Sequence, residues 1–207
     1  MPLKQQIENI PEKVKSEIKD RLREFSSFSR KDSKEWFSEL CFCILTANAK
    51  AKTALALQNT LGFEGFIRHD EKKLAEIIKS HKHRFHNNKA KYIVLARQFT
   101  DIKEKLNQFK DNNEKRKFLV NNVKGLGYKE ASHFLRNTGH FNLAILDRHI
   151  LNLLHENNII YNVPRPLNPK TYLEIEDKFN KIAFLLNQNP ASLDLHMWYL
   201  KTGNVLK

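Results

Sequence analysis

The chain has 207 residues, of which 41% are hydrophobic, including 14 Phe. This is enough apolar surface for the core of one large or two small domains, so a mostly disordered chain is excluded. Its 36 Lys and Arg outnumber its 23 Asp and Glu, and the net charge of +13 is spread along the sequence. Such a protein attracts polyanions, of which nucleic acid is the commonest. A basic protein with no such role, or one that meets an anionic membrane surface, stays open at this point.

The cysteines and the N-terminal residues give two further expectations. Cys41 and Cys43 are separated by one residue, and two thiols do not make a four-cysteine zinc or iron–sulfur site. We expect buried core thiols. Residues 1–6 lack an apolar signal core, and no run approaches the roughly 18 apolar residues of a membrane span. We therefore expect a reduced, intracellular protein, in the cytoplasm or nucleoid, that makes no contact with a membrane.

Apolar periodicity predicts three helices in the first part of the chain. Residues 7–28 form one amphipathic pattern with four apolar residues at helical spacing, Val14, Ile18, Leu22 and Phe25. Ser33 is expected to cap a second, buried helix that ends near residues 46–50. A third helix over residues 51–61 is expected to stop at Gly62.

A further helix face around residues 74–78 is followed by a block rich in basic and imidazole groups, residues 81–90. Phe85 stands within this block beside Arg84. The block is attractive to a polyanion. Its three histidines have irregular spacing and no nearby Asp, Glu or Cys, so we expect solvated loop histidines and no metal site.

The remaining helices follow from similar patterns. They are expected over residues 92–106, 111–122, from 150 onward, 172–186 and 191–203. Residues 157–169 are rich in Asn and Pro and are expected to be a non-helical connection. No segment shows sustained period-2 alternation with β-branched residues, so the predicted fold class is all-α.

The most informative stretch is residues 123–131, in which Gly125 and Gly127 flank Leu126 between two helical segments. Such a turn is tight and leaves backbone N–H groups exposed at a helix N-terminus. That geometry binds phosphate oxygens without reading base sequence. A Gly-X-Gly alone is weak evidence, because it occurs in many turns.

The wider pattern resembles a known family. Residues 123–132, 134–139 and 143–149 together resemble the helix-hairpin-helix signature of the DNA base-excision glycosylase superfamily. In this resemblance Lys129 corresponds to the nucleophile position and Asp147 to the essential aspartate. A lysine at the first position implies the bifunctional branch, which also cleaves the strand.

The chemistry of that branch requires these two residue types. A neutral amine can displace the base at C1′ and become a Schiff base, which then permits β-elimination of the 3′ phosphate. A carboxylate near the same carbon can stabilise the developing positive charge, and Asp147 is also placed to cap a helix. Lys129 as an ordinary solvated lysine, and Asp147 as a helix cap alone, are the competing interpretations.

Other features favour one branch of the superfamily. The chain has no cysteine after Cys43, unlike the members that hold an iron–sulfur cluster near the C-terminus. Its length, residues 84–90 and residues 192–207 resemble the compact archaeal second family of 8-oxoguanine DNA glycosylase/AP lyases. This implies a central helical subdomain of residues 33–140, a second subdomain of residues 1–32 plus 141–207, and a lesion-binding cleft between them.

The resemblance also implies a substrate pocket. Phe85 and Trp198 are the candidates for stacking on a flipped purine, and Trp198 could equally be a core residue. In the C-terminal stretch, Asp194 and Lys207 are further candidates for substrate binding.

The DNA backbone is expected to contact the hairpin through Gly125, Gly127 and Lys124. Asn48 matches the wedge position of the superfamily, and Arg84 is expected to share the task of filling the vacated space. Family structures can hold a monovalent cation at the hairpin carbonyls, and the sequence does not decide this for the present chain.

The predicted activity is excision of 8-oxoguanine from double-stranded DNA followed by strand cleavage, by a monomer without a cofactor. Two alternatives stay open. One is a glycosylase for an oxidised pyrimidine or alkylated purine. The other is a non-catalytic hairpin module that only docks DNA.

Overall fold

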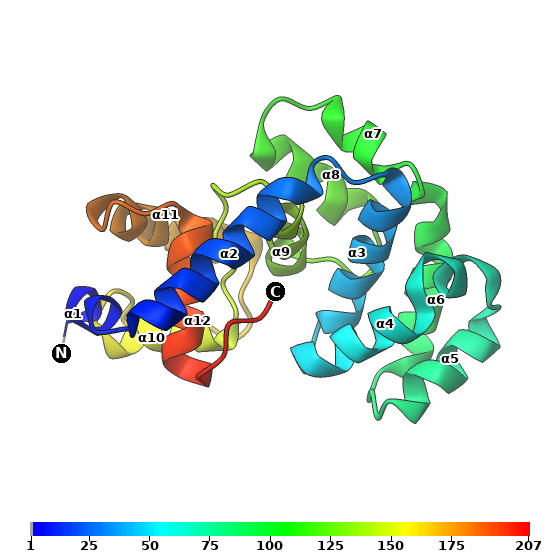
Figure 1. Cartoon of the computed structure of the whole chain (residues 1–207), viewed down its shortest axis with the longest axis horizontal. Helices are drawn as coiled ribbons and strands as arrows, with labels where there is room; N and C mark the ends of the chain where they lie inside the picture. The colour runs from blue at the N-terminus through cyan, green and yellow to red at the C-terminus, as the bar shows by residue number, and fades with distance from the viewer. Residues whose placement is uncertain (1) are drawn as a thin grey trace. The chain divides into compact units, whose positions relative to one another are not determined.

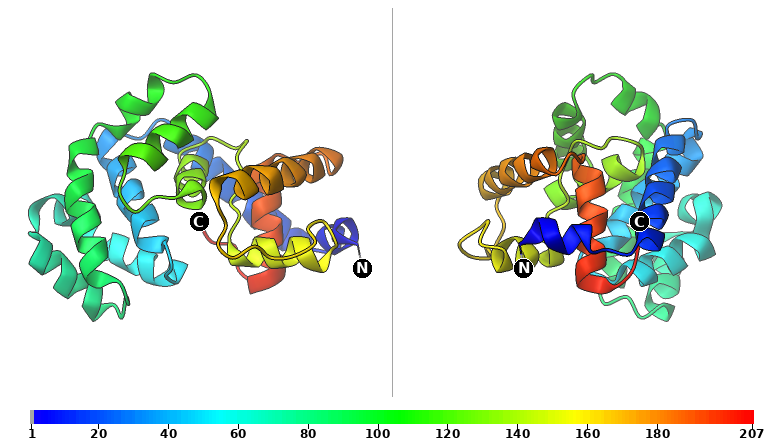
Figure 2. Two further views of the ribbon diagram at one scale, coloured as in Figure 1. Left: turned by 180° about the vertical axis from the view of Figure 1, so that it is seen from behind. Right: turned by 60° about the vertical axis from the view of Figure 1, so that its left-hand side comes forward.

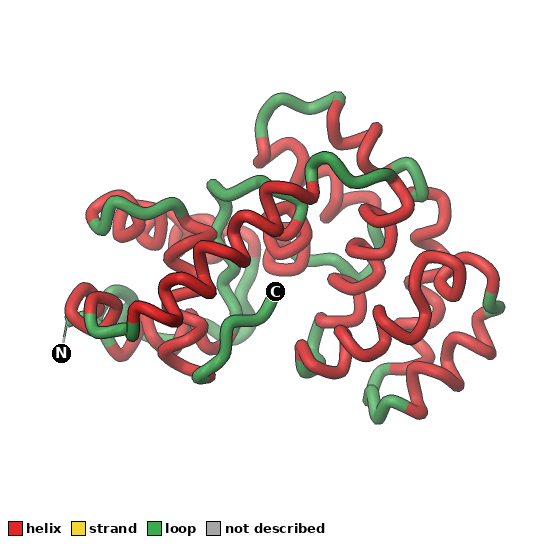
Figure 3. The backbone as a smooth tube through the Cα atoms, in the orientation of Figure 1, coloured by secondary structure: helices red, strands yellow, loops and turns green. Residues whose placement is uncertain are grey.

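The computed structural model describes residues 2–207, and every regular element in this range is helical (Figures 1 and 3). The predicted all-α class is confirmed. The elements are α1 (Leu3–Glu8), α2 (Glu12–Phe28), α3 (Ser33–Thr46), α4 (Ala51–Arg68), α5 (Glu71–Ser80), α6 (His86–Ala96), the 3-10 turn η1 (Arg97–Phe99), α7 (Ile102–Asn107), α8 (Asn112–Asn122), α9 (Tyr128–Asn137), α10 (Arg148–Glu156), α11 (Pro169–Leu185) and α12 (Pro190–Thr202).

The chain divides into two compact units, a central unit of residues 28–134 and a terminal unit of residues 1–27 with 135–207. The central unit begins five residues and ends six residues before the bounds of 33–140 expected from sequence. The reason lies in the side chains of α9. Phe134 packs edge-on against Trp36 of the central unit, whereas Arg136 binds Asp194 of the terminal unit.

The central unit is built around α3, which is almost completely buried from Trp36 onward. Trp36 packs against Phe28 and Phe134 with ring centroids 6.4 and 5.9 Å apart, and its indole N–H donates to the Phe28 carbonyl at 3.0 Å. Helix α4 lies against α3, and α5 lies beside α6 (Figure 2). A helix with apolar residues on all faces is stable only inside such a core.

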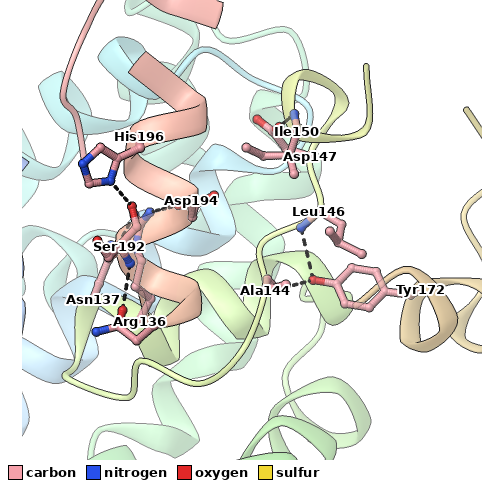
Figure 4. Close-up of polar contacts among 11 residues, drawn as sticks. Arg136, Asn137, Ala144, Leu146, Asp147, Ile150, Tyr172, Ser192, Asp194 and His196 are labelled. Carbon is pink, nitrogen blue, oxygen red and sulfur yellow. Dashed lines mark hydrogen bonds and ion pairs between the residues drawn. The ribbon is translucent and has the colours of Figure 1, made fainter. Parts of the chain in front are cut away.

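In the terminal unit, α10 packs beside α12, and both α1 and α11 contact α12. Two side chains of α11 hold the extended segment that enters α10. Glu176 accepts a hydrogen bond from the Ala144 N–H at 2.9 Å, and the Tyr172 hydroxyl donates to the Ala144 carbonyl at 2.7 Å. The Leu146 N–H donates to the same hydroxyl at 3.4 Å (Figure 4). These bonds fix the backbone immediately before Asp147.

A buried ion pair also stabilises the terminal unit. The Arg136 guanidinium binds the Asp194 carboxylate, and both side chains are only 5% exposed. Arg136 also lies 4.9 Å from the centroid of the Phe25 ring and donates two hydrogen bonds to the Asn137 side chain. These contacts join α9, α12 and α2 around one cation.

Several helix boundaries differ from the sequence-based expectations. The single helix predicted over residues 7–28 is two helices, because α1 ends at Glu8 and Pro11, which cannot continue it, directly precedes the first residue of α2, Glu12. The cap of α3 is Asp32, whose side chain accepts from the Glu35 N–H, and Ser33 is the first helical residue. Gly62 does interrupt the helix as predicted, at φ +54°, and a second segment continues to Arg68.

The expectation for residues 81–106 was wrong in two places. Helix α6 begins at His86, inside the block predicted to be loop, and ends at Ala96. The predicted helix over residues 92–106 is therefore divided into α6, η1 and α7. Charge density in residues 81–90 obscured the buried face of α6, which includes Lys89 and Ala90. Residues 157–168 contain no helix, as predicted, but Pro169, which was expected to belong to this connection, is the first residue of α11 because proline is tolerated in the first turn of a helix.

Among residues 2–207, no helix combines the length and the apolar character needed to cross a membrane.

Replacing Trp36 with Ala is expected to destabilise the central unit by about 3–5 kcal/mol, because it removes a fully buried ring and leaves a cavity. Trp36→Phe should cost less. Phe184→Ala is the control, since Phe184 is 81% exposed and such a change costs less than about 0.5 kcal/mol. Urea unfolding followed by circular dichroism measures all three. Equal loss in Trp36→Ala and Phe184→Ala would contradict this description of the core.

Replacing Arg136 with Met is expected to cost about 3–5 kcal/mol, because it leaves the Asp194 charge buried and unpaired. The matched control is Lys201→Met. Lys201 pairs with Glu156 at 2.7 Å and also joins α12 to α10, but this pair is partly exposed, so its loss should cost about 0–1 kcal/mol. The double variant Arg136→Met with Asp194→Leu should recover part of the loss. No recovery would show that Arg136 acts through other contacts.

Candidate functional site

The hairpin turn at residues 123–127 determines where α9 begins, and its backbone conformation requires a glycine at position 125. Gly125 has φ +94°, and a Cβ atom built on it would lie 2.5 Å from Cδ2 of Tyr92 in α6. Gly127 has no such conformation, and a Cβ there would meet only the Glu130 carboxylate, at 3.2 Å. The two glycines therefore have different roles. Gly125 allows the turn to pack against α6, whereas Gly127 leaves room for the side chain of Glu130.

The backbone N–H groups of the hairpin are less available than the sequence suggested. The Gly127 N–H donates to Glu130 Oε2 at 3.2 Å, and the Leu126 N–H donates to the Val123 carbonyl at 3.2 Å. The first bond has the geometry of half a capping box, in which a carboxylate of the first turn returns to the helix start. Lys124 is exposed next to this turn.

Lys129 lies in the first turn of α9 and is 26% exposed. Its ammonium is 2.9 Å from Glu130 Oε1, so one carboxylate holds both the hairpin backbone and the lysine. Burial alone would raise the pKa of Glu130, but the charge and hydrogen bond of Lys129, with the Gly127 N–H, lower it below its usual value. Glu130 is therefore a partly buried anion that positions the lysine.

A second lysine lies close to this pair. Lys89 of α6 is 5% exposed and donates from Nζ to the Ile44 carbonyl at 2.7 Å. Burial lowers the pKa of Lys89 to about 8, with Glu130 opposing this change and Lys129 adding to it. The central unit thus gathers two amines and one carboxylate within electrostatic reach of one another.

The predicted wedge residue Asn48 lies in the turn between α3 and α4, exposed and with φ +60°. Arg84 and Phe85 lie before α6. Phe85 is 40% exposed, and the Arg84 guanidinium lies 5.2 Å from the centroid of its ring. An exposed aromatic ring of this kind is free to stack on a ligand.

The histidines of residues 81–90 were expected to be solvated, and this expectation is wrong for His83, which is only 3% exposed. Its Nε2 bonds the Leu45 carbonyl at 2.9 Å, and its Nδ1 accepts from the Phe85 N–H at 3.2 Å. His81 ends α5, and His86 begins α6. The predicted loop is thus tied to α3 by a buried ring.

In the terminal unit, Asp147 is the N-cap of α10, as predicted. Its Oδ1 accepts a hydrogen bond from the Ile150 N–H at 2.8 Å (Figure 4). The charge on Asp147 also contributes to the titration of Asp194. Burial raises the pKa of Asp194 to about 6, Arg136 opposes this rise, and Asp147 adds to it. The two carboxylates are therefore within electrostatic reach, and Asp194 is the one bound to a cation.

Trp198 is half-buried on α12, with its ring edge-on to His149 at a centroid separation of 5.0 Å. Its buried indole N–H has no hydrogen-bond partner among the described residues. A tryptophan that served the core alone would be expected to satisfy this donor. Lys207 is partly buried.

The central unit therefore brings together Lys129 with the hairpin, and Phe85 and Arg84 with the end of α3. The terminal unit brings together Asp147 and Asp194.

Sequence reasoning missed Glu130, Lys89 and His83. A signal existed for Glu130, because it follows Gly127 by three residues at the start of a helix. No local pattern marks Lys89 and His83, since their partners are carbonyls distant in sequence.

Within residues 2–207, no group of three or more His, Cys, Asp or Glu side chains is arranged to hold a metal ion.

Comparison with known proteins gives a consistent family. The model of the family described as 8-oxoguanine DNA glycosylase matches residues 18–188. A protein of Methanocaldococcus jannaschii named 8-oxoguanine DNA glycosylase/AP lyase is 49% identical over 205 residues, covering 97% of this chain and 99% of that protein. A Thermotoga maritima protein of the same name is 38% identical over 206 residues, covering 99% of each.

Two solved structures are closely similar. One is the Methanocaldococcus jannaschii 8-oxoguanine glycosylase/lyase in complex with a 15mer DNA containing 8-oxoguanine, with a TM-score of 0.96, 47% identity and 99% coverage of both chains. The other is the 8-oxoguanine DNA glycosylase of Thermotoga maritima, with a TM-score of 0.93, 37% identity and coverage of 99% of this chain and 98% of that one. The hairpin, the lysine that follows it and the capping aspartate thus occur in a chain that belongs to the 8-oxoguanine DNA glycosylase family.

Proposed function

We propose that this protein excises 8-oxoguanine from double-stranded DNA and then cleaves the strand at the abasic site. The observation that carries the proposal is the arrangement around Lys129, an accessible amine held 2.9 Å from the partly buried carboxylate of Glu130 directly after the hairpin. Relatives that share this chain's full length are named for both activities. The basic composition, with a net charge of +13, fits a DNA substrate.

In the proposed reaction, the Lys129 ammonium first loses a proton to water, its neutral nitrogen attacks C1′ of the damaged nucleotide, and the C1′–N9 bond breaks. The base leaves with the bonding electrons and takes up a proton. Opening of the sugar ring gives a Schiff base, which acidifies the C2′ proton. Loss of that proton breaks the C3′–O3′ bond and cleaves the strand by β-elimination. Glu130 holds the lysine chain in place before attack.

Asp147 is proposed to stabilise the positive charge that develops on the sugar as the base departs. Its position suits this role because one carboxylate oxygen is fixed by the Ile150 N–H at 2.8 Å. A carboxylate held by the protein needs little reorganisation when the charge appears, which is the basis of electrostatic catalysis. The α11 contacts to Ala144 and Leu146 support the backbone that carries it.

The remaining candidate residues are assigned to DNA and to the base. Gly125, Gly127 and Lys124 are proposed to lie along the phosphate backbone. Asn48 and Arg84 are proposed to fill the space left by the flipped nucleotide. The contacts to the phosphate backbone carry no information about base identity.

For the base itself, Phe85 and Trp198 are proposed to supply stacking surfaces. Lys207 is proposed to contact the substrate at the pocket edge. Asp194 is proposed to act on the site through Arg136 and Asp147 rather than by touching the base. The protein is proposed to act as a monomer.

Lys129→Gln is expected to abolish the covalent complex formed when the protein is reduced with borohydride on a duplex containing 8-oxoguanine. Glutamine keeps most of the side-chain length but has no amine that can form an imine. The control is Lys124→Gln, which should still give the trapped complex at saturating protein. It should weaken the affinity for all DNA sequences and reduce the slope of log K against log salt concentration by about one. Denaturing electrophoresis detects the complex. A trapped complex in Lys129→Gln would contradict the proposed nucleophile.

The same trapping assay separates the alternatives. Duplexes that each carry one oxidised pyrimidine or one alkylated purine test for another lesion preference. A chain that binds duplex DNA with steep salt dependence but traps on none of these substrates would be a docking module only.

Asp147→Asn is expected to leave stability almost unchanged, because asparagine caps helices as well as aspartate does. It should nevertheless slow excision by about 100-fold or more, since the fixed charge is lost. Asp147→Ala should lose the charge and the cap together, costing about 1 kcal/mol in addition. Single-turnover excision and thermal unfolding measure the two effects. Full activity in a stable Asp147→Asn variant would show that Asp147 acts only as a helix cap and not in catalysis.

A further inference from the structure

The buried ring of His83 connects two segments that the proposed function uses separately. On one side it bonds the Leu45 carbonyl, in the last turn of α3, at 2.9 Å. On the other side its Nδ1 accepts from the backbone N–H of Phe85 at 3.2 Å. The ring is only 3% exposed, so neither bond competes with bulk water.

These two bonds determine the protonation state of the ring. An Nδ1 that accepts a hydrogen bond from an N–H carries no proton, so the proton of the neutral ring is on Nε2. Nε2 can then donate to the Leu45 carbonyl, which is only an acceptor. Both ring nitrogens are satisfied in this one tautomer, and a doubly protonated ring would lose the bond to Phe85.

The wedge turn, the turn between α3 and α4 that carries the proposed wedge residue Asn48, begins where α3 ends. The carbonyls in the last turn of a helix have no partner within that helix. Here Leu45 is bonded by His83 and Ile44 by Lys89, at 2.7 Å. The turn that carries Asn48 follows directly, so its starting point is fixed by two side chains from the segment around Phe85.

We infer that His83 is a positioning residue that couples the stacking ring of Phe85 to the wedge turn of Asn48, and that it acts in base recognition rather than in strand cleavage. This inference rests on the proposed function of Phe85 and Asn48. If Phe85 binds the damaged base, an error in its backbone position displaces the base relative to Lys129. A displacement of about 1 Å can cost 100-fold in rate.

The charges around the ring favour the same neutral state. Burial lowers the pKa of His83; the bond to Leu45 opposes this, and Lys89, His86 and Arg84 add to it. Lys89 lies on α6, and its own electrostatic partners are Glu130 and Lys129 of α9. Because burial lowers the pKa of His83, the ring gains its second proton, and the coupling is lost, at a lower pH than for an ordinary histidine.

The test compares two reactions of the full-length protein, excision of 8-oxoguanine and β-elimination at a preformed abasic site. The abasic substrate has no base for Phe85 to hold, but it still needs Lys129. His83→Phe keeps an aromatic ring and removes both bonds. We expect excision to slow about tenfold or more, while elimination changes by less than about threefold. Equal loss of both reactions, or no loss of excision, would overturn the inference.

Two further variants separate the bonds. Asparagine can place an acceptor where Nδ1 lies, and glutamine a donor where Nε2 lies. His83→Asn should therefore excise faster than His83→Gln, because it keeps the bond to Phe85. The reverse order would overturn the role of that bond. His81→Gln, which changes a neighbouring histidine bonded to Thr60 and Ile77, should leave the ratio of the two rates unchanged.

An NMR measurement makes the inference independent of activity. The ¹⁵N shifts of the His83 ring should report an unprotonated Nδ1 and a protonated Nε2 in the wild-type protein. In His83→Gln, the amide signal of Phe85 should shift. If the wild type neither excises nor eliminates, the proposed function fails. If the ring shows the other tautomer, or the Phe85 signal stays in place, the coupling fails by itself.

Discussion

The close approach of the hairpin to α6 is the constraint on which the proposed active site depends. Gly125 has a left-handed backbone, and its Cα faces the Tyr92 ring so closely that no side chain fits. This packing fixes where α9 begins, and α9 carries both Lys129 and Glu130 in its first turn. The rest of the central unit supports this contact. Helix α6 is held in turn against α3 by the bond from Lys89 to the Ile44 carbonyl.

The charged side chains that lie out of solvent near the candidate residues have partners. In the central unit, Glu130 binds Lys129 and the Gly127 N–H, while Lys89 is held by a carbonyl. In the terminal unit, Arg136 binds Asp194. Such groups are costly to bury and rarely add net stability over apolar residues of the same volume. Their position beside the candidate nucleophile and beside Asp147 is consistent with a functional role, because perturbed titration clusters at functional sites.

Much of this could be predicted from the sequence, for identifiable reasons. The all-α class follows from periodicity, and the cap at Asp147 follows from an acidic residue at the start of an apolar helical run. The hairpin residues could be found because they are consecutive. His83 and Lys89 could not, since each binds a carbonyl of α3 that is 38 or 45 residues away. Their residue types instead suggested a solvated loop. Charge and periodicity predict where a helix lies better than they predict where it begins and ends. The break before α2 at Pro11 and the start of α6 at His86 are two examples.

The central claim is that Lys129, and not another amine, forms the Schiff base. Lys89 is the most informative competitor, because burial lowers its pKa to about 8 and leaves it more often neutral. It is, however, 5% exposed and bonded to a carbonyl, whereas Lys129 is accessible. The direct measurement is peptide mapping by mass spectrometry of the wild-type protein after borohydride reduction on a duplex containing 8-oxoguanine. The account predicts the sugar adduct on Lys129, and an adduct on Lys89 or on any other amine would contradict it.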